Sequence, residues 1–184
     1  MLLDIGIGIL SSIFFCRVFG IALYPFFLWA SILFSLLPDL DFLPNFRKGF
    51  TAKGHEHRSL LHYPLFFIPI GSIILLFLDS RLALLFAINT FLHFLHDSIG
   101  IGWGVQWLYP FSKNYYAFFY HRDLLENGSH QKAFHSWNPA EVARLANEYG
   151  DEHWFRNIYL RFSPYAIVEY LVFIFALVVL FFYH

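Results

Sequence analysis

The chain has 184 residues, of which 58% are hydrophobic, 22% aromatic and only 14% charged. Soluble domains are about one-half apolar and about one-quarter charged, so this composition favours a membrane protein over a soluble one. The net charge of −1 gives no reason to expect a nucleic acid partner. The single cysteine, Cys16, rules out an intrachain disulfide and is interpreted as a packing residue inside an apolar run.

Apolar segments predict an all-α fold, a polytopic helical membrane protein with about four to five transmembrane helices. Residues 2–37 exceed the ~20 residues that cross a bilayer as a helix. Arg17, Gly20 and Pro25 interrupt them, so two helices are expected there. The helices are expected near residues 2–18, 22–37, 60–78, 82–99 and 165–183. The first and fourth are short for complete spans, which leaves open a re-entrant hairpin at the N-terminus.

The stretch at residues 100–163 differs in kind from the apolar segments. It begins with a mixture of Trp, Tyr, Phe, Lys and Arg that is typical of a membrane–water interface. Further on, Asn138, Pro139 and Glu141 have the order of a helix N-cap and first turn, and Gly150 marks a helix end. A short amphipathic helix is therefore expected, with an apolar face made of Val142, Leu145, Ala146 and Tyr149. It would serve either as a structural lid or as a substrate contact.

These features divide the chain into a membrane-embedded domain at residues 1–112, a cytoplasmic or interfacial segment at 113–163, and a C-terminal transmembrane helix at 164–184. With five spans, the loop after the second helix and the stretch before the last helix share one side. Of the 12 Lys and Arg residues, all but Arg17 and Arg81 lie on that side. The positive-inside rule then places this side in the cytoplasm.

Ionisable residues gather at the ends of the apolar segments. The second segment ends with Asp39 and Asp41. The third opens with His55, Glu56, His57, Arg58 and His62. The fourth carries a polar stripe near its end, formed by Asn89, His93, His96 and Asp97. All three groups fall at one membrane face, and each ionisable group costs about 2.5–3.5 kcal/mol at a helix centre, so they indicate a functional site facing the bundle interior.

Histidine and aspartate together are good ligands for zinc or a similar divalent ion. The candidate metal ligands are Asp39, Asp41, His57, His62, His93 and Asp97. They could hold one catalytic metal or two that share a carboxylate, with zinc favoured and manganese or magnesium as alternatives. Arg58 is a candidate clamp for a phosphate or carboxylate, and Glu56 or His96 a candidate proton carrier.

Each group has an ordinary interpretation when it is taken alone. His93 and Asp97 could form only a hydrogen-bonded pair, the Pro38–Asp41 turn could only end a helix, and residues 55–58 could only contact headgroups. Their shared face is what favours a metal site. The later histidines are interpreted as interfacial or loop residues, although two of them could reach a second metal, His130 and His135.

Three separated motifs occur in a recognisable order. An LPDxD segment covers residues 37–41, an HRxxxH segment covers 57–62, and His93 and Asp97 form an HxxxD helix end. They are followed by Gly102, Gly104, Trp107 and the stretch Tyr109, Pro110 and Phe111. Over residues 20–112 the chain therefore resembles the YdjM family, inner-membrane proteins classed as metal-dependent hydrolases and known for a LexA-regulated bacterial member.

The chain also departs from that family pattern. The family often has a histidine near the N-terminus, where this chain offers only Asp4. The family's HRGxTHS sequence reads HRSLLHY here, without the threonine. The resemblance implies a metal-dependent hydrolase of an inner membrane. Because the candidate site lies at the cytoplasmic face, the expected substrate is an ester or phosphoester of a lipid or lipid-linked molecule. Two other interpretations stay open: a metal-binding or metal-transporting protein, and a purely structural zinc site.

Overall fold

The computed structural model describes residues 2–41, 61–100, 102–119, 133–151, 153 and 156–183. The elements, in chain order, are α1 (Leu2–Phe19), α2 (Pro25–Leu36), α3 (Pro64–Leu76), α4 (Ser80–Asp97), β1 (Tyr115–Phe118), β2 (Phe134–Trp137), α5 (Pro139–Tyr149), the π-helical turn η3 (Arg156–Leu160) and α6 (Pro164–Phe181). The described part of the fold is mostly helical with little sheet, as the apolar segments predict.

The helix starts follow from local sequence. Pro25, Pro64 and Pro164 each stand at a first helical position, where the missing N–H costs nothing and the fixed φ suits the helix. Asp79 caps α4 by accepting a hydrogen bond from the Arg81 N–H at 2.7 Å. Each of the five expected helices is present, and its ends differ from the expected ones by a few residues at most.

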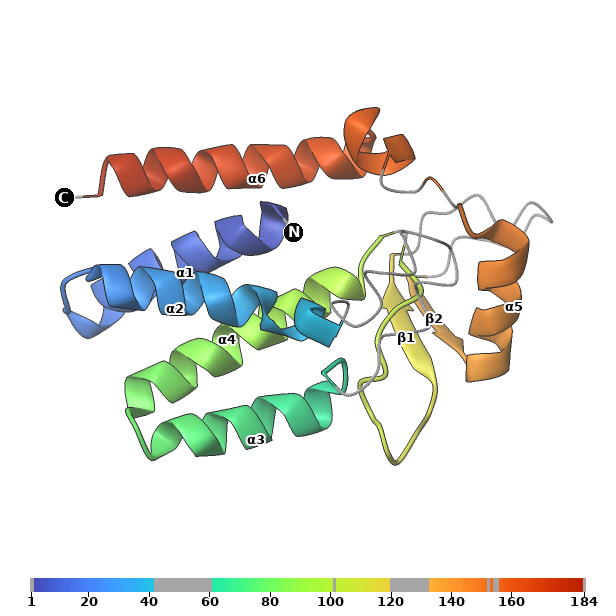
Figure 1. Cartoon of the computed structure of the whole chain (residues 1–184), viewed down its shortest axis with the longest axis horizontal. Coiled ribbons are helices and arrows are strands. Elements are labelled where there is room, and N and C mark those ends of the chain that lie inside the picture. The colour runs from blue at the N-terminus through green and yellow to red at the C-terminus, as the bar shows by residue number, and fades with distance from the viewer. Residues whose placement is uncertain are drawn as a thin grey trace.

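Helices that are consecutive in the chain, α1 with α2 and α3 with α4, run antiparallel, whereas α6 runs parallel to α1 (Figure 1). Helix α1 contacts α2, α4 and α6, and α4 also contacts α2 and α3. Close approach depends on small residues: a Cβ at Gly8 would lie 2.8 Å from the Ile32 Cα of α2, and one at Gly6 would lie 3.2 Å from the Phe173 Cα of α6. The N-terminal ends of α1, α3 and α6 and the C-terminal ends of α2 and α4 meet at one end of the bundle (Figure 1).

Two of the described helices, α1 and α6, are long and apolar enough to cross a membrane. Helix α4 is as long as α1, at 18 residues, but carries the polar stripe. Helices α2 and α3 are shorter, at 12 and 13 residues. The expected total of four to five transmembrane helices therefore remains a prediction.

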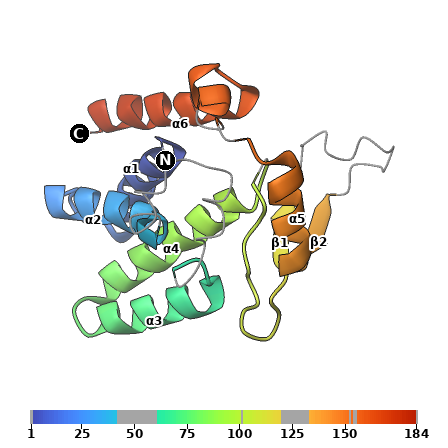
Figure 2. The ribbon, with the colours of Figure 1, turned by 45° about the vertical axis from the view of Figure 1, so that its right-hand side comes forward.

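Beyond the C-terminal end of α4 lie the two strands and α5 (Figure 2). The strands pair antiparallel, with Tyr115 opposite Trp137 and Phe118 opposite Phe134. The all-α prediction contains neither strand: β1 lies in the aromatic stretch interpreted as an interface belt, and β2 in the polar part that follows it. Helix α5 is where it was expected: Asn138 and Glu141 form a capping box and Gly150 is the C-cap residue.

Candidate metal centre

Polar side chains line the face of α4 that points into the bundle. Asn89 and His93 are buried, and Asp97 at the end of the helix is 14% exposed. Asn89 donates a hydrogen bond to Ser31 Oγ of α2 at 3.0 Å, and Ser31 donates to the Gly8 carbonyl of α1 at 2.7 Å. The predicted polar stripe therefore faces the interior and links three helices.

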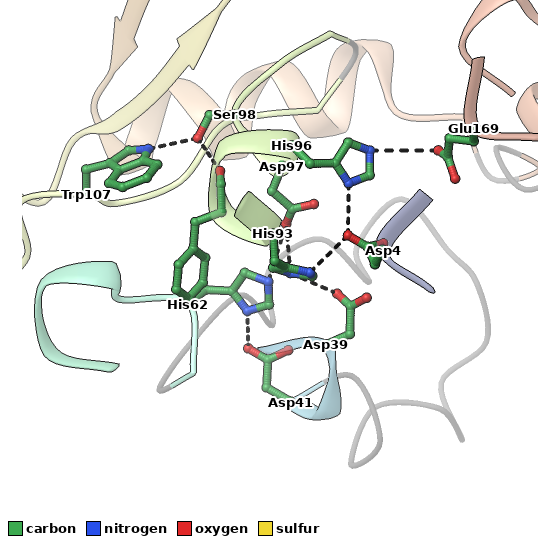
Figure 3. Close-up of polar contacts among 11 residues, drawn as sticks. Asp4, Asp39, Asp41, His62, His93, His96, Asp97, Ser98, Trp107 and Glu169 are labelled. Atoms are coloured by element: carbon green, nitrogen blue, oxygen red, sulfur yellow. Dashed lines mark hydrogen bonds and ion pairs between the residues drawn. The ribbon is translucent and has the colours of Figure 1, made fainter. Parts of the chain in front are cut away.

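Four side chains converge at the C-terminal end of this stripe, and we call them the Asp/His group (Figure 3). The group consists of Asp39, His62, His93 and Asp97, and one ligand atom from each lies within 4.8 Å of the others. His62 Nε2 is 3.4 Å from Asp97 Oδ2. His93 Nε2 is 3.6 Å from Asp39 Oδ1 and 3.9 Å from Asp97 Oδ2. Two imidazoles and two carboxylates at this spacing can hold a divalent metal ion.

Each of the two histidines turns its other ring nitrogen toward a carboxylate outside the group. His62 Nδ1 is 2.7 Å from Asp41 Oδ2, and His93 Nδ1 is 3.2 Å from Asp4 Oδ1. A carboxylate at Nδ1 favours the tautomer that is protonated there, which leaves the Nε2 lone pair for a ligand. Metal-ligating histidines commonly have such partners, so the surroundings of both imidazoles fit a metal centre.

The negative charges of the Asp/His group and its opening to the surface also suit the binding of a cation. The pKa of Asp39 is raised by partial burial and further by the carboxylates of Asp97 and Asp4, whereas His93 opposes the shift. A cation between these carboxylates relieves that repulsion. Within the described residues neither ring nitrogen of His93 makes a hydrogen bond; Nδ1 is in ion-pair contact with Asp4, and Nε2 faces the group. The side chain of Asp39 is 40% exposed and that of His62 only 3%, so the group opens to the surface beside Asp39.

A second polar network runs from the Asp/His group toward α6. Asp4 Oδ1 lies 3.2 Å from His96 Nδ1, and His96 Nε2 is 3.9 Å from Glu169 Oε1. Tyr159 donates a hydrogen bond to Glu169 Oε1 at 2.8 Å. Burial and the neighbouring Glu169 carboxylate raise the pKa of Tyr159, so its hydroxyl remains a proton donor. Asp4 thus faces His93 of the group and His96 of the second network.

The end of α4 is fixed by the segment that follows it. Trp107 Nε1 donates to Ser98 Oγ at 2.8 Å, and the Phe118 N–H of β1 donates to the Ser98 carbonyl at 2.6 Å. Gly104 has φ +82°, and a Cβ there would lie 2.3 Å from the Tyr116 carbonyl oxygen. Only glycine fits this position, and it lets β1 pack beside the helix end that carries Asp97.

The structure brings together four of the residues that the sequence offered as metal ligands. Asp41 is not in the group, because it faces the Nδ1 side of His62. His57, Arg58 and Glu56 lie outside the described residues, as do two of the later histidines, His121 and His130. Of the other two, His135 stacks on Trp137 with ring centroids 5.3 Å apart and His153 is exposed, and neither belongs to the Asp/His group.

Sequence reasoning missed the parts that Asp4 and Glu169 play. Both are buried acids inside strongly apolar helices, α1 and α6. The same principle that drew attention to α4, the cost of an ionisable group among apolar residues, could have found them. Without a fold, nothing in the sequence connected the first and last helices to the end of α4.

Comparison with known proteins gives one match. The family model described as YdjM inner membrane protein matches residues 5–184, well beyond the 20–112 over which the motifs showed the resemblance. No curated protein and no solved structure matches the chain. The membrane localisation expected from composition, and the inner membrane expected from the resemblance, agree with this family and with the two long apolar helices. Since the match covers nearly the whole sequence, the chain belongs to the YdjM inner membrane protein family.

Proposed function

We propose that this protein is a metal-dependent hydrolase of the inner membrane, acting on an ester or phosphoester of a lipid or lipid-linked substrate. The observation that carries the proposal is the geometry of the Asp/His group. His62 and His93 each direct Nε2 toward Asp97, while Asp41 and Asp4 occupy their Nδ1 sides. Because four protein ligands would close a tetrahedral zinc site, catalysis in this proposal needs an ion that takes a further ligand, and water or substrate would reach it beside the exposed Asp39 carboxylate.

The chain's own residues have distinct roles in this proposal. Asp39, His62, His93 and Asp97 hold a divalent ion, for which zinc suits the mixed nitrogen and oxygen ligands. When bound, such an ion supplies Lewis acidity toward a carbonyl or phosphoryl oxygen and acidifies water. Asp41 and Asp4 keep both imidazoles in the ligating tautomer. His96, 3.2 Å from the same Asp4 oxygen, is the candidate proton carrier within the described residues.

Arg58 and Glu56 stay in the proposal as the sequence offered them: Arg58 as a clamp for the substrate anion and Glu56 as a second candidate proton carrier. His57 stays as a further candidate ligand. The distribution of basic residues supports a cytoplasmic site. Arg17 is in the last turn of α1 and Arg81 in the first turn of α4, so both lie at the end of the bundle away from the Asp/His group.

The depth of the polar residues favours hydrolysis over metal transport. Transport needs polar groups along the whole path through the membrane. On α4 the polar stripe stops at Asn89, and the buried residues before it in the helix are Leu82, Ala83, Leu85 and Phe86. Among the described residues, the buried ionisable side chains are therefore concentrated at one end of the bundle, where a lipid headgroup would be reached.

The test is hydrolysis by the detergent-purified protein supplied with zinc, manganese or magnesium. Phosphatidylglycerol, phosphatidylethanolamine, a fatty-acyl ester and a lipid-linked diphosphate are the substrates, and mass spectrometry detects the products. The metal-loaded wild type should release a product that Asp97→Asn does not, while His153→Gln, a change at an exposed histidine, retains activity. Absence of product together with metal uptake by reconstituted vesicles, lost in His93→Ala, would favour transport instead.

A further inference from the structure

An apolar groove of about 580 Å³ runs along α3 and starts beside the Asp/His group. Its lining includes Phe34 and Leu37 at the end of α2, Tyr63 before α3, Ile70 and Ile74 on α3, and Tyr109. The volume falls within the roughly 300–1,000 Å³ of typical ligand pockets. Every lining residue is apolar or aromatic, and the only polar side-chain atoms are the two phenol oxygens.

The groove lies one aromatic ring away from the Asp/His group: Phe67 of its lining packs edge-on against Phe94 with ring centroids 6.0 Å apart, and Phe94 packs edge-on against His62 with centroids 5.9 Å apart. Tyr63 directly follows the ligand His62, and Leu37 stands two positions before the ligand Asp39. The rings of Tyr63 and Tyr109 stack with their centroids 4.0 Å apart at this end. An acyl chain in the groove with its polar end at Leu37 and Tyr63 has that end toward the chain segments that carry Asp39 and His62.

We propose that this groove holds one acyl chain of the lipid substrate, with the hydrolysable polar group at the Asp/His group. The inference rests on the proposed function and narrows the substrate to lipids in which an ester or phosphoester is joined closely to a long alkyl chain. From Tyr63 to Leu75, the groove follows α3 for about 18 Å at 1.5 Å per residue. That length suits an extended chain rather than a compact apolar molecule.

The shape of the groove distinguishes it from the ordinary lipid-facing surface. Its floor includes Phe86 of α4, which is buried and packs edge-on against Phe34 with ring centroids 5.3 Å apart. Gly71 makes room for this arrangement, since a Cβ there would lie 2.3 Å from Phe86 Cζ. The missing side chain therefore keeps α3 close to α4 and leaves a hollow beside them. On α6, Leu171 and Phe175 are exposed and do not line this groove.

The experiment maps contacts of the chain directly, without turnover. Full-length protein is reconstituted in phosphatidylglycerol vesicles that contain a small share of phosphatidylglycerol with a photoactivatable diazirine near the end of one acyl chain. After illumination, labelled peptides are identified by mass spectrometry in the metal-free and zinc-loaded protein. Labelling should concentrate on the Ile70 and Ile74 side of α3, several-fold above the exposed face of α6.

Two variants make the test specific. Ile74→Trp fills the groove at an exposed position, so folding is preserved, and it should reduce the labelling of α3 several-fold. Ile73→Trp is the matched control, because the neighbouring Ile73 is also exposed but does not line the groove. Equal labelling of α3 and α6, unchanged by Ile74→Trp, would overturn the inference.

The outcomes separate this inference from the proposed function. Selective labelling without any hydrolysis by the metal-loaded wild type would contradict the hydrolase and leave a lipid-binding groove. Hydrolysis with uniform labelling would support the hydrolase and overturn the groove as the acyl site. Selective labelling together with hydrolysis that Ile74→Trp impairs for long acyl chains, but not for short ones, would support both.

Discussion

Nδ1 of His93 lies 3.2 Å from Oδ1 of Asp4, although the two residues come from the fourth and the first helices. The contact makes the first turn of α1 part of the candidate metal centre. A carboxylate in this position orients a ligating imidazole and increases its basicity. Asp4 stands where the family often has a histidine, and its place behind His93 gives it an orienting role.

Replacement of Asp4 by Asn should weaken metal binding without abolishing it. The amide keeps the shape but loses the charge that holds the His93 tautomer, and changes of this kind typically cost about 10–100-fold in affinity. Competition titration with a fluorescent zinc chelator measures the effect. Asp79→Asn is the control, since Asp79 is bonded to Arg81 at the start of α4, and it should leave affinity unchanged. An Asp4→Asn protein with wild-type affinity would remove Asp4 from the centre.

Asp41 and Asp97 should respond differently to the same substitution. Asp41→Asn removes a carboxylate from the Nδ1 side of His62 and should lower affinity while the stoichiometry is retained. Asp97→Asn removes a ligand next to both imidazoles and should abolish stoichiometric binding. Metal content after gel filtration distinguishes the two. If both variants retained one equivalent, or both lost it, the assignment of Asp41 as an orienting residue would be wrong.

Much of the fold follows from local patterns in the sequence. Proline at the first helical position fixed the starts of three helices, and the box formed by Asn138 and Glu141 fixed the start of α5. The polar stripe of α4 was also readable, because one face of a single helix depends only on the helical period. These features are determined by residues a few positions apart.

The unpredicted features depend on contacts between distant segments. The pairing of Tyr116 with Ser136 joins strands too short and too aromatic to show alternation. The approach of Glu169 to His96 requires α6 to pack on α1, which depends on helix packing rather than on periodicity. The sequence placed Asp41 near the centre but could not decide which side of His62 it faces.

The hydrogen bond from Tyr159 to Glu169 should contribute more to stability than the hydrogen bond from Tyr170 to the Tyr159 carbonyl. Tyr159→Phe removes a donor to a buried carboxylate, which costs about 1.5–3 kcal/mol, and should lower the Tm. Tyr170→Phe removes a bond to the neutral Tyr159 carbonyl and should cost only about 0.5–1.5 kcal/mol. Thermal unfolding in detergent, followed by circular dichroism, compares them. Equal losses would mean that the carboxylate does not strengthen the first bond.

The stability that depends on Tyr159 should be lost at alkaline pH. Its pKa is raised in the folded protein, so the protonated phenol is favoured in the native state and ionisation above about pH 10 favours unfolding. Stability from this group is therefore present below the ordinary tyrosine pKa and decreases as the pH rises. The Tm of the wild type should fall more steeply above about pH 10 than that of Tyr159→Phe. Parallel curves would contradict the raised pKa.

Gly104 should tolerate no side chain. Gly104→Ala combines a positive φ with a Cβ placed 2.3 Å from a backbone oxygen, so β1 must shift, and we expect a loss of about 3 kcal/mol or more. Gly20→Ala is the matched control, since φ is +61° there but no atom lies within 4 Å of the new Cβ. It should cost only about 1–2 kcal/mol. Chemical unfolding measures both, and equal losses would show that the close approach of Tyr116 is unimportant.

The metal content of the purified protein tests the central claim most directly. Wild type and the His93→Ala/Asp97→Ala double variant are purified in detergent without chelator, given zinc, desalted and measured by elemental mass spectrometry. The account predicts stoichiometric zinc, on the order of one equivalent, in the wild type and loss of that zinc in the folded double variant. Absence of zinc from the wild type, or equal zinc in both proteins, would contradict a metal centre at the Asp/His group.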